Sequence, residues 1–328
     1  GVFRKTEGLL LTEWKGICMS NSKTAAPPAG ARKRRKSTSA WLDFLCVLPA
    51  LAFLLVFIYY PIVDLVRISF TDWNLIKPQY NYVGFDNWIW LFTGSGTKYL
   101  LNSLKVTVLY TAGELAVTII GGIIFALIFN RMTKFFGTMR AIVFVPKYVA
   151  MSSAAVIFLW IFNKNTGILN HFLGILGIAP VDWLGDRNIA LLSVLMLTGW
   201  RAIGYGMMIY LSAMMGISKD YYEAASLDGA NAFQRFKSIT LPLLSPTTLF
   251  LFVTTFISAM KVFQSVDILT SGGPYRSTEV LVYLVYQYAM RDFRIDRAAT
   301  IAIVFFILLL IFTAATMKVS NKNVHYDS

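Results

Sequence analysis

Charged residues are scarce in this chain of 328 residues. They make up 14% of it, whereas hydrophobic residues make up 56% and the mean hydropathy is +0.60. A soluble domain ordinarily carries about 25% charged residues, so the composition indicates a membrane protein. The net charge of +13 does not indicate a nucleic-acid partner, because much of the basic excess lies in the first 40 residues, ahead of the first long apolar segment.

Cysteine and histidine are rarer still. The two cysteines, Cys18 and Cys46, and the two histidines, His171 and His325, lie far apart in the sequence. Their positions match neither a disulfide framework nor a metal-site spacing. The sequence also lacks the G-x-x-x-x-G-K-[ST] phosphate loop of ATP-hydrolysing proteins. We therefore expect no catalytic residues, no metal site and no cofactor bound by this chain.

Long apolar segments are abundant. A helix of about 20 mostly apolar residues crosses the hydrocarbon core of a membrane, and several segments meet this requirement. They run approximately over residues 44–63, 106–129, 141–162, 189–215, 242–260 and 298–317. The sequence therefore predicts an all-α integral membrane bundle of about six transmembrane helices.

A basic cluster, Arg32–Lys36, lies just before the first apolar segment. Lys and Arg concentrate on the cytoplasmic side of membrane helices, so we expect the N-terminus and, after six crossings, the C-terminus to be cytosolic. Residues 1–40 are expected to be a disordered basic tail, 41–317 the transmembrane domain and 318–328 a C-terminal tail. The first apolar segment is too long for a signal-peptide core. The natural start could be Met19, with the residues before it an upstream extension.

Ionisable residues within predicted spans are candidate functional residues. Arg201 is the clearest, and Tyr205 lies one turn later on the same helical face. A guanidinium can bind a carboxylate or phosphate through two hydrogen bonds; alternatively, Arg201 is a structural charge paired with Glu114 or with a helix end. Glu114 and Lys147 lie on adjacent spans; we interpret them as a structural pair, the alternative being a role in transport. Lys261 is either a solute contact or a residue that extends to the membrane interface.

A short apolar piece, Val280–Met290, follows Gly272, Gly273 and Pro274. It is too short to span a membrane. It is therefore either a re-entrant element that lines a pathway or a flat helix at the interface.

The segment 218–242 predicts two helices joined by a sharp turn. Asp220 can cap the first helix, with Glu223 completing a capping box. Gly229 suits a turn with positive φ, and Pro242 suits the first turn of the fifth span. The second helix is expected to be amphipathic, with one apolar face formed by Phe233, Phe236 and Ile239. Such a loop, continuous with a membrane span, can pass force from a soluble partner into the bundle.

The same segment has the pattern EAA, three residues, Gly, nine residues, Ile-x-Leu-Pro. It resembles the cytosolic coupling loop of ABC importer permeases, in which this loop contacts a separate ATPase. The positions that the resemblance assigns to ATPase coupling are Glu223, Ala224, Ala225, Asp228, Gly229, Ile239, Leu241 and Pro242.

Other motifs resemble the sugar branch of these importers, the maltose-type and glycerol-phosphate-type permeases. They are Val83–Trp88; the series Pro146, Trp160, Gly167 and Asn170; and Leu269–Pro274 followed by Thr278, Glu279 and Tyr283. The resemblance extends from about residue 60 to 317, with the type I permease core over about 100–317.

The resemblance implies a type I importer in the cytoplasmic membrane of a bacterium or archaeon. Its expected partners are a second permease subunit, a dimer of ATP-binding subunits, an extracytoplasmic solute-binding protein, a carbohydrate substrate and the lipid bilayer. ATP and Mg²⁺ would be bound by the ATPase subunits, so this chain is not expected to be an enzyme.

The resemblance also assigns sugar-contacting positions in the fourth and fifth spans. They are Arg201, Ala202, Tyr205, Thr255, Ser258, Ala259 and Val262. Tyr205 is the same residue type as in the maltose-type permease, and Thr255 and Ser258 keep hydroxyls. Ala259 and Val262 lack the amides that the maltose type uses, which puts maltose itself in doubt. An anionic saccharide, such as a uronate-containing sugar, stays open because of Arg201.

Two other functions compete with this interpretation. A secondary transporter of small polar solutes, driven by an ion gradient, would carry buried carboxylates and often inverted repeats. Of the carboxylates here, Glu114 is the well-placed one, and the coupling pattern occurs once. A membrane scaffold without transport activity would leave Arg201 and the coupling pattern unexplained.

Overall fold

The computed structural model describes residues 38–323, except residues 77 and 132. The basic cluster, Met19 and most of the expected N-terminal tail therefore lie outside the described residues, as does the end of the expected C-terminal tail. The chain divides into two units, residues 1–58 and 59–328, which we treat separately. The described part of the first unit consists of α2 (Thr38–Leu54) and most of the π-helical turn η1 (Leu55–Tyr59).

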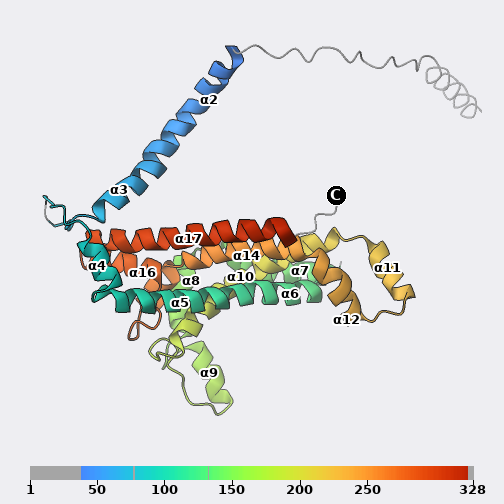
Figure 1. Ribbon diagram of the computed structural model, residues 1–328. Coiled ribbons are helices and arrows are strands. Elements are labelled where there is room, and N and C mark those ends of the chain that lie inside the picture. The colour runs from blue at the N-terminus through green and yellow to red at the C-terminus, as the bar shows by residue number, and fades with distance from the viewer. Residues whose placement is uncertain (1–37, 77, 132, 324–328) are drawn as a thin grey trace, which may run out of the picture. The chain divides into compact units, whose positions relative to one another are not determined.

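The second unit is a bundle of helices (Figure 1). Apart from an isolated bridge between Thr71 and Tyr82, its described regular elements are helical. They are α3 (Tyr60–Ile68), α4 (Asp86–Phe92), α5 (Gly96–Ala116), η2 (Val117–Gly121), α6 (Gly122–Ile128), α7 (Lys134–Phe144), η3 (Val145–Tyr148), α8 (Met151–Ile161), α9 (Ile168–Ile175), α10 (Ala190–Met215), α11 (Lys219–Leu227), α12 (Ala232–Arg235), η4 (Phe236–Thr240), α13 (Leu241–Leu243), α14 (Ser245–Met260), α15 (Gln264–Leu269), α16 (Leu281–Tyr286), η5 (Gln287–Arg291) and α17 (Ile295–Asn323).

Four helices within the described residues are long and apolar enough to cross a membrane unaided. They are Phe44–Ile68, Gly96–Ile128, Ala190–Met215 and Ile295–Thr316. Two further spans are possible as bent pairs of helices, which gives up to six. The prediction of an all-α bundle with about six spans is therefore confirmed. The second span begins ten residues earlier than predicted, and α17 continues to Asn323, into the expected C-terminal tail.

The third predicted span is not one straight helix. Lys134–Tyr148 and Met151–Ile161 meet at an angle of 103°. Pro146 lies just before the break, where it can neither donate a backbone hydrogen bond nor extend a regular helix. Val149 then adopts an extended conformation, with φ −67° and ψ 129°. The break places the backbone of residues 146–149 beside α10 rather than within a helix.

The fifth predicted span is also bent, so the expectation of one continuous helix from Pro242 to Ser258 is wrong. Ala232–Leu243 and Ser245–Met260 meet at 62°. Leu244 leaves the regular helical path, with φ −83° and ψ −2°, and Pro246 lies in the first turn of α14. A proline there cannot donate the helical hydrogen bond to the carbonyl four residues earlier, so the helix restarts instead of continuing.

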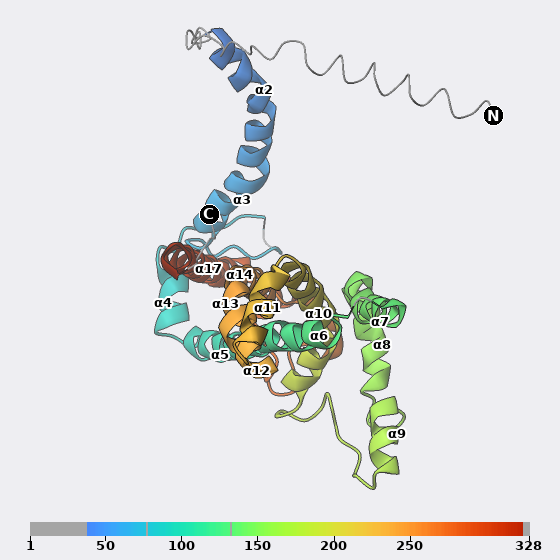
Figure 2. The same cartoon turned by 90° about the vertical axis from the view of Figure 1, so that its right-hand side faces the viewer.

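Helix α10 lies at the centre of the second unit, and Figure 2 shows it beside α6. The two helices approach closely at glycines, because a Cβ on Gly122 would lie 2.9 Å from the carbonyl carbon of Gly206. Small residues permit such backbone contact between membrane helices. Met207, Tyr210 and Leu251 then fill a core between α6, α10 and α14.

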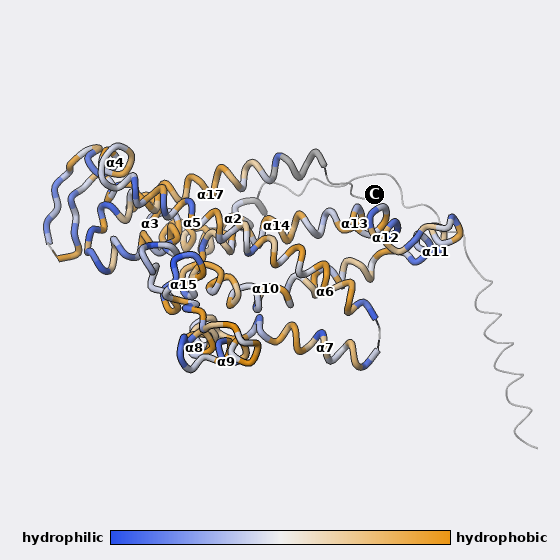
Figure 3. The backbone as a smooth tube through the Cα atoms, turned by 90° about the horizontal axis from the view of Figure 1, so that it is seen from below, coloured by the Kyte–Doolittle hydropathy of each residue, from blue (hydrophilic) through white to orange (hydrophobic). Residues whose placement is uncertain are grey.

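Hydrophilic residues gather at the two ends of the second unit, while hydrophobic ones predominate along α10, α14 and α17 (Figure 3). Helices α11 and α12 lie at one end, and α4 and α16 lie at the opposite end (Figure 1).

Two buried asparagines hold irregular segments of the second unit. The Asn87 amide donates to the carbonyls of Ser69 and Thr71, at 3.0 and 2.7 Å. The Asn170 amide donates to the carbonyls of Lys164 and Val181, and its oxygen accepts from the Val181 backbone and from the Trp183 indole. Both asparagines belong to motifs noted in the sequence, and both stabilise irregular backbone through hydrogen bonds.

The motif that begins with Leu269–Pro274 folds back on itself. The Thr270 and Thr278 hydroxyls lie 2.7 Å apart, and Gly272 packs against the ring of Tyr283, where a Cβ would lie 2.6 Å from a ring carbon. The short helix that follows, α16, packs against α5 and α17 and is buried at Leu281, Tyr283 and Leu284. The predicted Val280–Met290 element is thus enclosed by protein over its first half, unlike a helix with a freely exposed apolar face.

Candidate functional site

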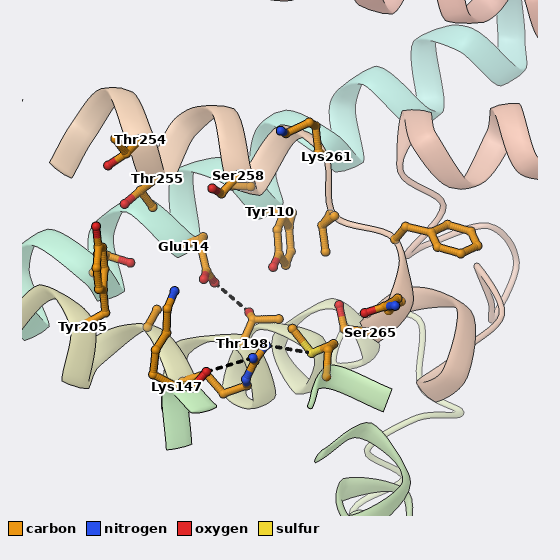
Figure 4. A pocket seen from close by; sticks show the side chains of 18 residues that line it. Tyr110, Glu114, Lys147, Thr198, Tyr205, Thr254, Thr255, Ser258, Lys261 and Ser265 are labelled. Carbon is orange, nitrogen blue, oxygen red and sulfur yellow. Dashed lines mark hydrogen bonds between the residues drawn. The ribbon is translucent and has the colours of Figure 1, made fainter. Parts of the chain in front are cut away.

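A cavity of about 400 Å³ lies between α5, the break after α7, α10, α14 and the segment that follows α14 (Figure 4). It brings together every residue that the sequence analysis assigned to substrate binding. These are Arg201, Ala202, Tyr205, Thr255, Ser258, Ala259 and Val262. Residues from two helices that are more than 30 positions apart in sequence therefore share one chamber.

Three of these residues offer groups suited to a polar solute. Thr255 and Ser258 present hydroxyls one turn apart on α14, and Tyr205 presents an aromatic ring and a hydroxyl from α10 (Figure 4). Ligand cavities characteristically combine apolar and aromatic walls with a few polar groups that fix orientation. The chamber has both kinds of group.

The cavity also has lining residues that the sequence analysis did not assign to substrate binding. They include Tyr110, Thr118, Met151, Thr198, Thr254, Phe263, Gln264 and Ser265. Tyr110 and Thr118 each lie four positions from Glu114, so helical spacing around that carboxylate would have found them. Gln264 and Ser265 follow a loop whose course could not be read from periodicity.

Arg201 does not pair with Glu114. Its Nε donates to the Pro146 carbonyl at 3.3 Å, and its Nη2 donates to the Lys147 carbonyl at 3.2 Å. Its Nη1 lies 3.4 Å from the Met151 sulfur. Of the alternatives that the sequence left open, the contact observed is the one with a helix end.

Glu114 and Lys147 line the same cavity without forming an ion pair among the described residues. Glu114 accepts a hydrogen bond of 2.7 Å from the Thr198 hydroxyl. The Lys147 amine lies 4.5 Å from the centroid of the Tyr205 ring, a favourable cation–π geometry. The predicted structural pair is therefore replaced by two separate sets of contacts.

At one end of the second unit, the predicted coupling loop forms two helices joined by a turn. The first is α11, and its N-terminal cap is Ser218, whose hydroxyl accepts from the Asp220 amide at 3.3 Å. The predicted cap at Asp220 is wrong, because that residue already lies within the helix and Ser218 has the extended backbone of a cap. The capping box occurs instead on α12, between Asn231 and Gln234.

The turn after α11 depends on Gly229. Its φ is +77°, in the left-handed region that glycine adopts without steric cost. The Ala230 amide then donates to the Ala225 carbonyl at 2.9 Å, which closes the C-terminal end of the helix. A glycine at this position is therefore required by the backbone, as the sequence predicted.

The predicted coupling residues lie on or beside this exposed loop. Glu223 and Ala224 are exposed on α11, and Leu241 is partly exposed at the start of α13. Apolar side chains are exposed beside them: Leu227 is 91% exposed and Phe233 is 71% exposed. The second helix, predicted to be amphipathic, has one turn of α-helix followed by the π-helical turn η4. Phe236 and Ile239 are half-buried, whereas Phe233 is exposed. The other predicted coupling positions on this loop are Ala225, Asp228, Ile239 and Pro242.

Comparison with known proteins decides the family. The sequence model of a family described as "Binding-protein-dependent transport system inner membrane component" matches residues 118–324, a range that includes α10, the coupling loop and α14. The chain belongs to this family. The chain is therefore an inner membrane component of a binding-protein-dependent transport system.

Relatives of this transport component match over nearly their whole length. It is 35% identical over 287 residues to the trehalose/maltose transport system permease protein MalF of Thermococcus litoralis, covering 87% of this chain and 96% of that protein. It is 33% identical over 281 residues to the probable ABC transporter permease protein YurN of Bacillus subtilis, covering 84% and 95%. It is 30% identical over 286 residues to the sn-glycerol-3-phosphate transport system permease protein UgpA of Agrobacterium fabrum, covering 87% and 96%.

The fold of this transport component is also known from solved structures. A chain in the crystal structure of a bacterial ABC transporter involved in the import of the acidic polysaccharide alginate matches with a TM-score of 0.76 and 23% identity, covering 88% of this chain and 97% of that one. The likeness establishes a permease fold for the described bundle.

Proposed function

We propose that this chain is the transmembrane subunit of an ATP-driven importer that passes a carbohydrate through the cavity between α5, α10 and α14. The observation that carries the proposal is the presence, in one chain of this family, of a polar and aromatic cavity and an exposed coupling loop. The names of two relatives, which refer to trehalose/maltose and to sn-glycerol-3-phosphate transport, support a saccharide or polyol substrate.

The assembly proposed around this chain has four kinds of component. A second permease subunit completes the membrane pathway, a dimer of ATP-binding subunits docks on α11, and an external solute-binding protein delivers the carbohydrate. Both termini and the coupling loop face the cytosol of a bacterium or archaeon, and α4 and α16 face outward. ATP and Mg²⁺ are bound by the ATPase subunits, so hydrolysis occurs outside this chain.

The coupling step proposed is mechanical. Closure of the ATPase subunits displaces α11, whose exposed Glu223 and Leu227 offer one charge and an apolar contact. Large apolar groups exposed together commonly mark a protein-binding surface. The displacement reaches α14 through the second helix of the loop, and α14 carries Thr255 and Ser258 in the cavity.

Reconstitution in vesicles with the partner permease, the ATPase and the binding protein tests this function. ATP-driven uptake of a saccharide should fall strongly in Glu223→Ala and in Gly229→Val. Gly177→Val is the matched control, because Gly177 has a similar φ of +73° and, like Gly229, open space around it, but lies outside the coupling loop. Normal ATP-driven uptake in both loop variants would contradict the coupling role. Uptake driven by an ion gradient without the ATPase would instead support the secondary transporter.

A further inference from the structure

The guanidinium of Arg201 is committed to the backbone of the broken third span. The carbonyls at a helix end are short of donors within the helix. Arg201 donates to two of them: that of Lys147 and that of Pro146, which also accepts from the Val149 amide at 3.2 Å. Its third nitrogen faces Met151, the first residue of α8. All three guanidinium nitrogens therefore contact the two sides of one break, and the charge is directed at the protein rather than at a solute.

A glycine on the same helix supports this arrangement. Gly204 packs against the end of α7, where a Cβ would lie well under 3.0 Å from the Val143 carbonyl oxygen. Helix α10 can therefore approach the break closely, and Arg201, three positions earlier, reaches the carbonyls. Together these residues fix the backbone of residues 143–147 against α10.

This fixed backbone presents Lys147 to the cavity. The Lys147 amine extends from one wall toward the Tyr205 ring, and Lys261 enters from the opposite side, at the end of α14 (Figure 4). Neither amine forms an ion pair with a carboxylate in the part of the chain that the structure describes. The lining includes three basic side chains and one acidic one, so the cavity has an excess of positive charge.

We infer that Lys147 and Lys261, rather than Arg201, bind an anionic group of the transported saccharide or polyol. Arg201 is then a positioning residue that holds Lys147 at the break. A carboxylate or phosphate at either amine would form charge-assisted hydrogen bonds in a partly desolvated chamber. The Thr255 and Ser258 hydroxyls remain available for the uncharged part of the solute. This inference rests on the proposed function and adds that the substrate is negatively charged.

The first experiment measures uptake by the complete transporter in vesicles. The probes are a digalacturonate, its neutral methyl ester, sn-glycerol 3-phosphate and glycerol, each supplied over a range of concentrations from far below to above saturation. We expect uptake of an anionic probe, and the carboxylate and phosphate probes distinguish the two sources of negative charge. Lys147→Gln and Lys261→Gln should each raise the KM for that probe by about tenfold, the usual effect of losing one charged hydrogen bond.

Matched variants separate charge from general damage. Lys147→Arg should keep most of the anion affinity, because it keeps the positive charge. Lys105→Gln removes an exposed lysine of α5 that does not line the cavity and should leave the KM unchanged. Arg201→Gln should lower the maximal rate for charged and neutral probes alike and, because it loosens Lys147, should raise the KM for the anionic probe by less than Lys147→Gln does.

Three outcomes would contradict the inference. Uptake of neutral probes alone by the unmodified transporter would show that the substrate is not an anion, and would leave the proposed function standing. A rise in anion KM in Arg201→Gln, with none in the two lysine variants, would return the anion site to Arg201. Failure to transport any saccharide or polyol with ATP would overturn the proposed function itself.

Discussion

The hydroxyl of Tyr222 lies 2.9 Å from that of Thr240, across 18 residues of the coupling loop. The first residue belongs to α11 and the second to the π-helical turn that leads toward α14. A second link joins the Arg235 guanidinium to the Ser226 hydroxyl at 2.8 Å. These two side-chain links hold α11 against the helix that enters the bundle, so the loop can move as one body.

Loss of the first link should weaken coupling. Tyr222→Phe keeps the ring but removes the partner of the Thr240 hydroxyl on α11. Thr240 is a buried residue, 5% exposed. We expect a stability loss of about 1 kcal/mol and a several-fold lower ratio of solute transported to ATP hydrolysed. Parallel assays of uptake and phosphate release measure that ratio. Tyr221→Phe, at an exposed position of the same helix, is the control, and equal ratios in the two variants would contradict the prediction.

Gly204→Ala should destabilise the protein by overpacking. The added methyl group would meet the Val143 carbonyl oxygen and the Phe144 Cα, both of them backbone atoms that cannot rotate away. Overpacking of this kind costs about 1–3 kcal/mol, and thermal unfolding of the purified protein should show a lower Tm. Gly174→Ala is the matched control, because a methyl group added there, on α9, would meet no neighbouring atom within 4 Å. An unchanged Tm in Gly204→Ala would mean that α10 and α7 are not held as closely as described.

Asn170→Ala should loosen the segment between α9 and α10. The substitution removes a side chain that bonds the Val181 backbone, the Lys164 carbonyl and the Trp183 indole. Each buried group left without a partner costs about 1–3 kcal/mol. Hydrogen exchange of residues 164–183 should become faster by at least tenfold. Asn165→Ala, at an exposed neighbouring position, should leave exchange at the unmodified rate, and slow exchange in Asn170→Ala would refute the fastening role.

Glu279 should make stability depend on pH. Burial raises the pKa of this carboxyl above its ordinary value of 4.5, while Arg276 and the Ser103 hydroxyl offset part of the rise. The folded state therefore binds the proton more tightly than the unfolded state does. The stabilisation is fully present below the ordinary pKa and is lost as pH rises through the raised one.

Thermal unfolding measured from about pH 4, below the ordinary pKa, up to about pH 8 tests this effect. The difference in Tm between the unmodified protein and Glu279→Gln should shift in favour of the variant as pH rises. Glu223→Gln, on the exposed surface of α11, serves as the comparison. A difference that stays constant across the range would exclude Glu279 as the group responsible.

The sequence predicted the number and type of the spans because each is a long apolar run, and hydropathy records length and composition. It did not predict the two bends, since a hydropathy window is insensitive to direction. Signals for both were present. Pro146 lies inside the third apolar run and Pro246 inside the fifth, and an internal proline breaks or kinks a helix.

The cavity was predicted better than its chemistry. The positions on α10 and α14 came from family resemblance, and the structure places them in one chamber. A helix end was among the partners predicted for Arg201, but which end could not be predicted, because the carbonyls are exposed by an unexpected break. Likewise, Ser218 and Asp220 are both good capping residues, and the local backbone decides which of them lies outside the helix.

The 62° angle between Ala232–Leu243 and α14 has a consequence for how the loop could drive the bundle. A push along the axis of the incoming helix has its larger component perpendicular to α14. The same stroke of the ATPase would therefore swing α14 sideways more than it would slide it lengthwise. Thr255 and Ser258 would then move across the cavity rather than along the axis of α14. Such a movement would widen or narrow the cavity.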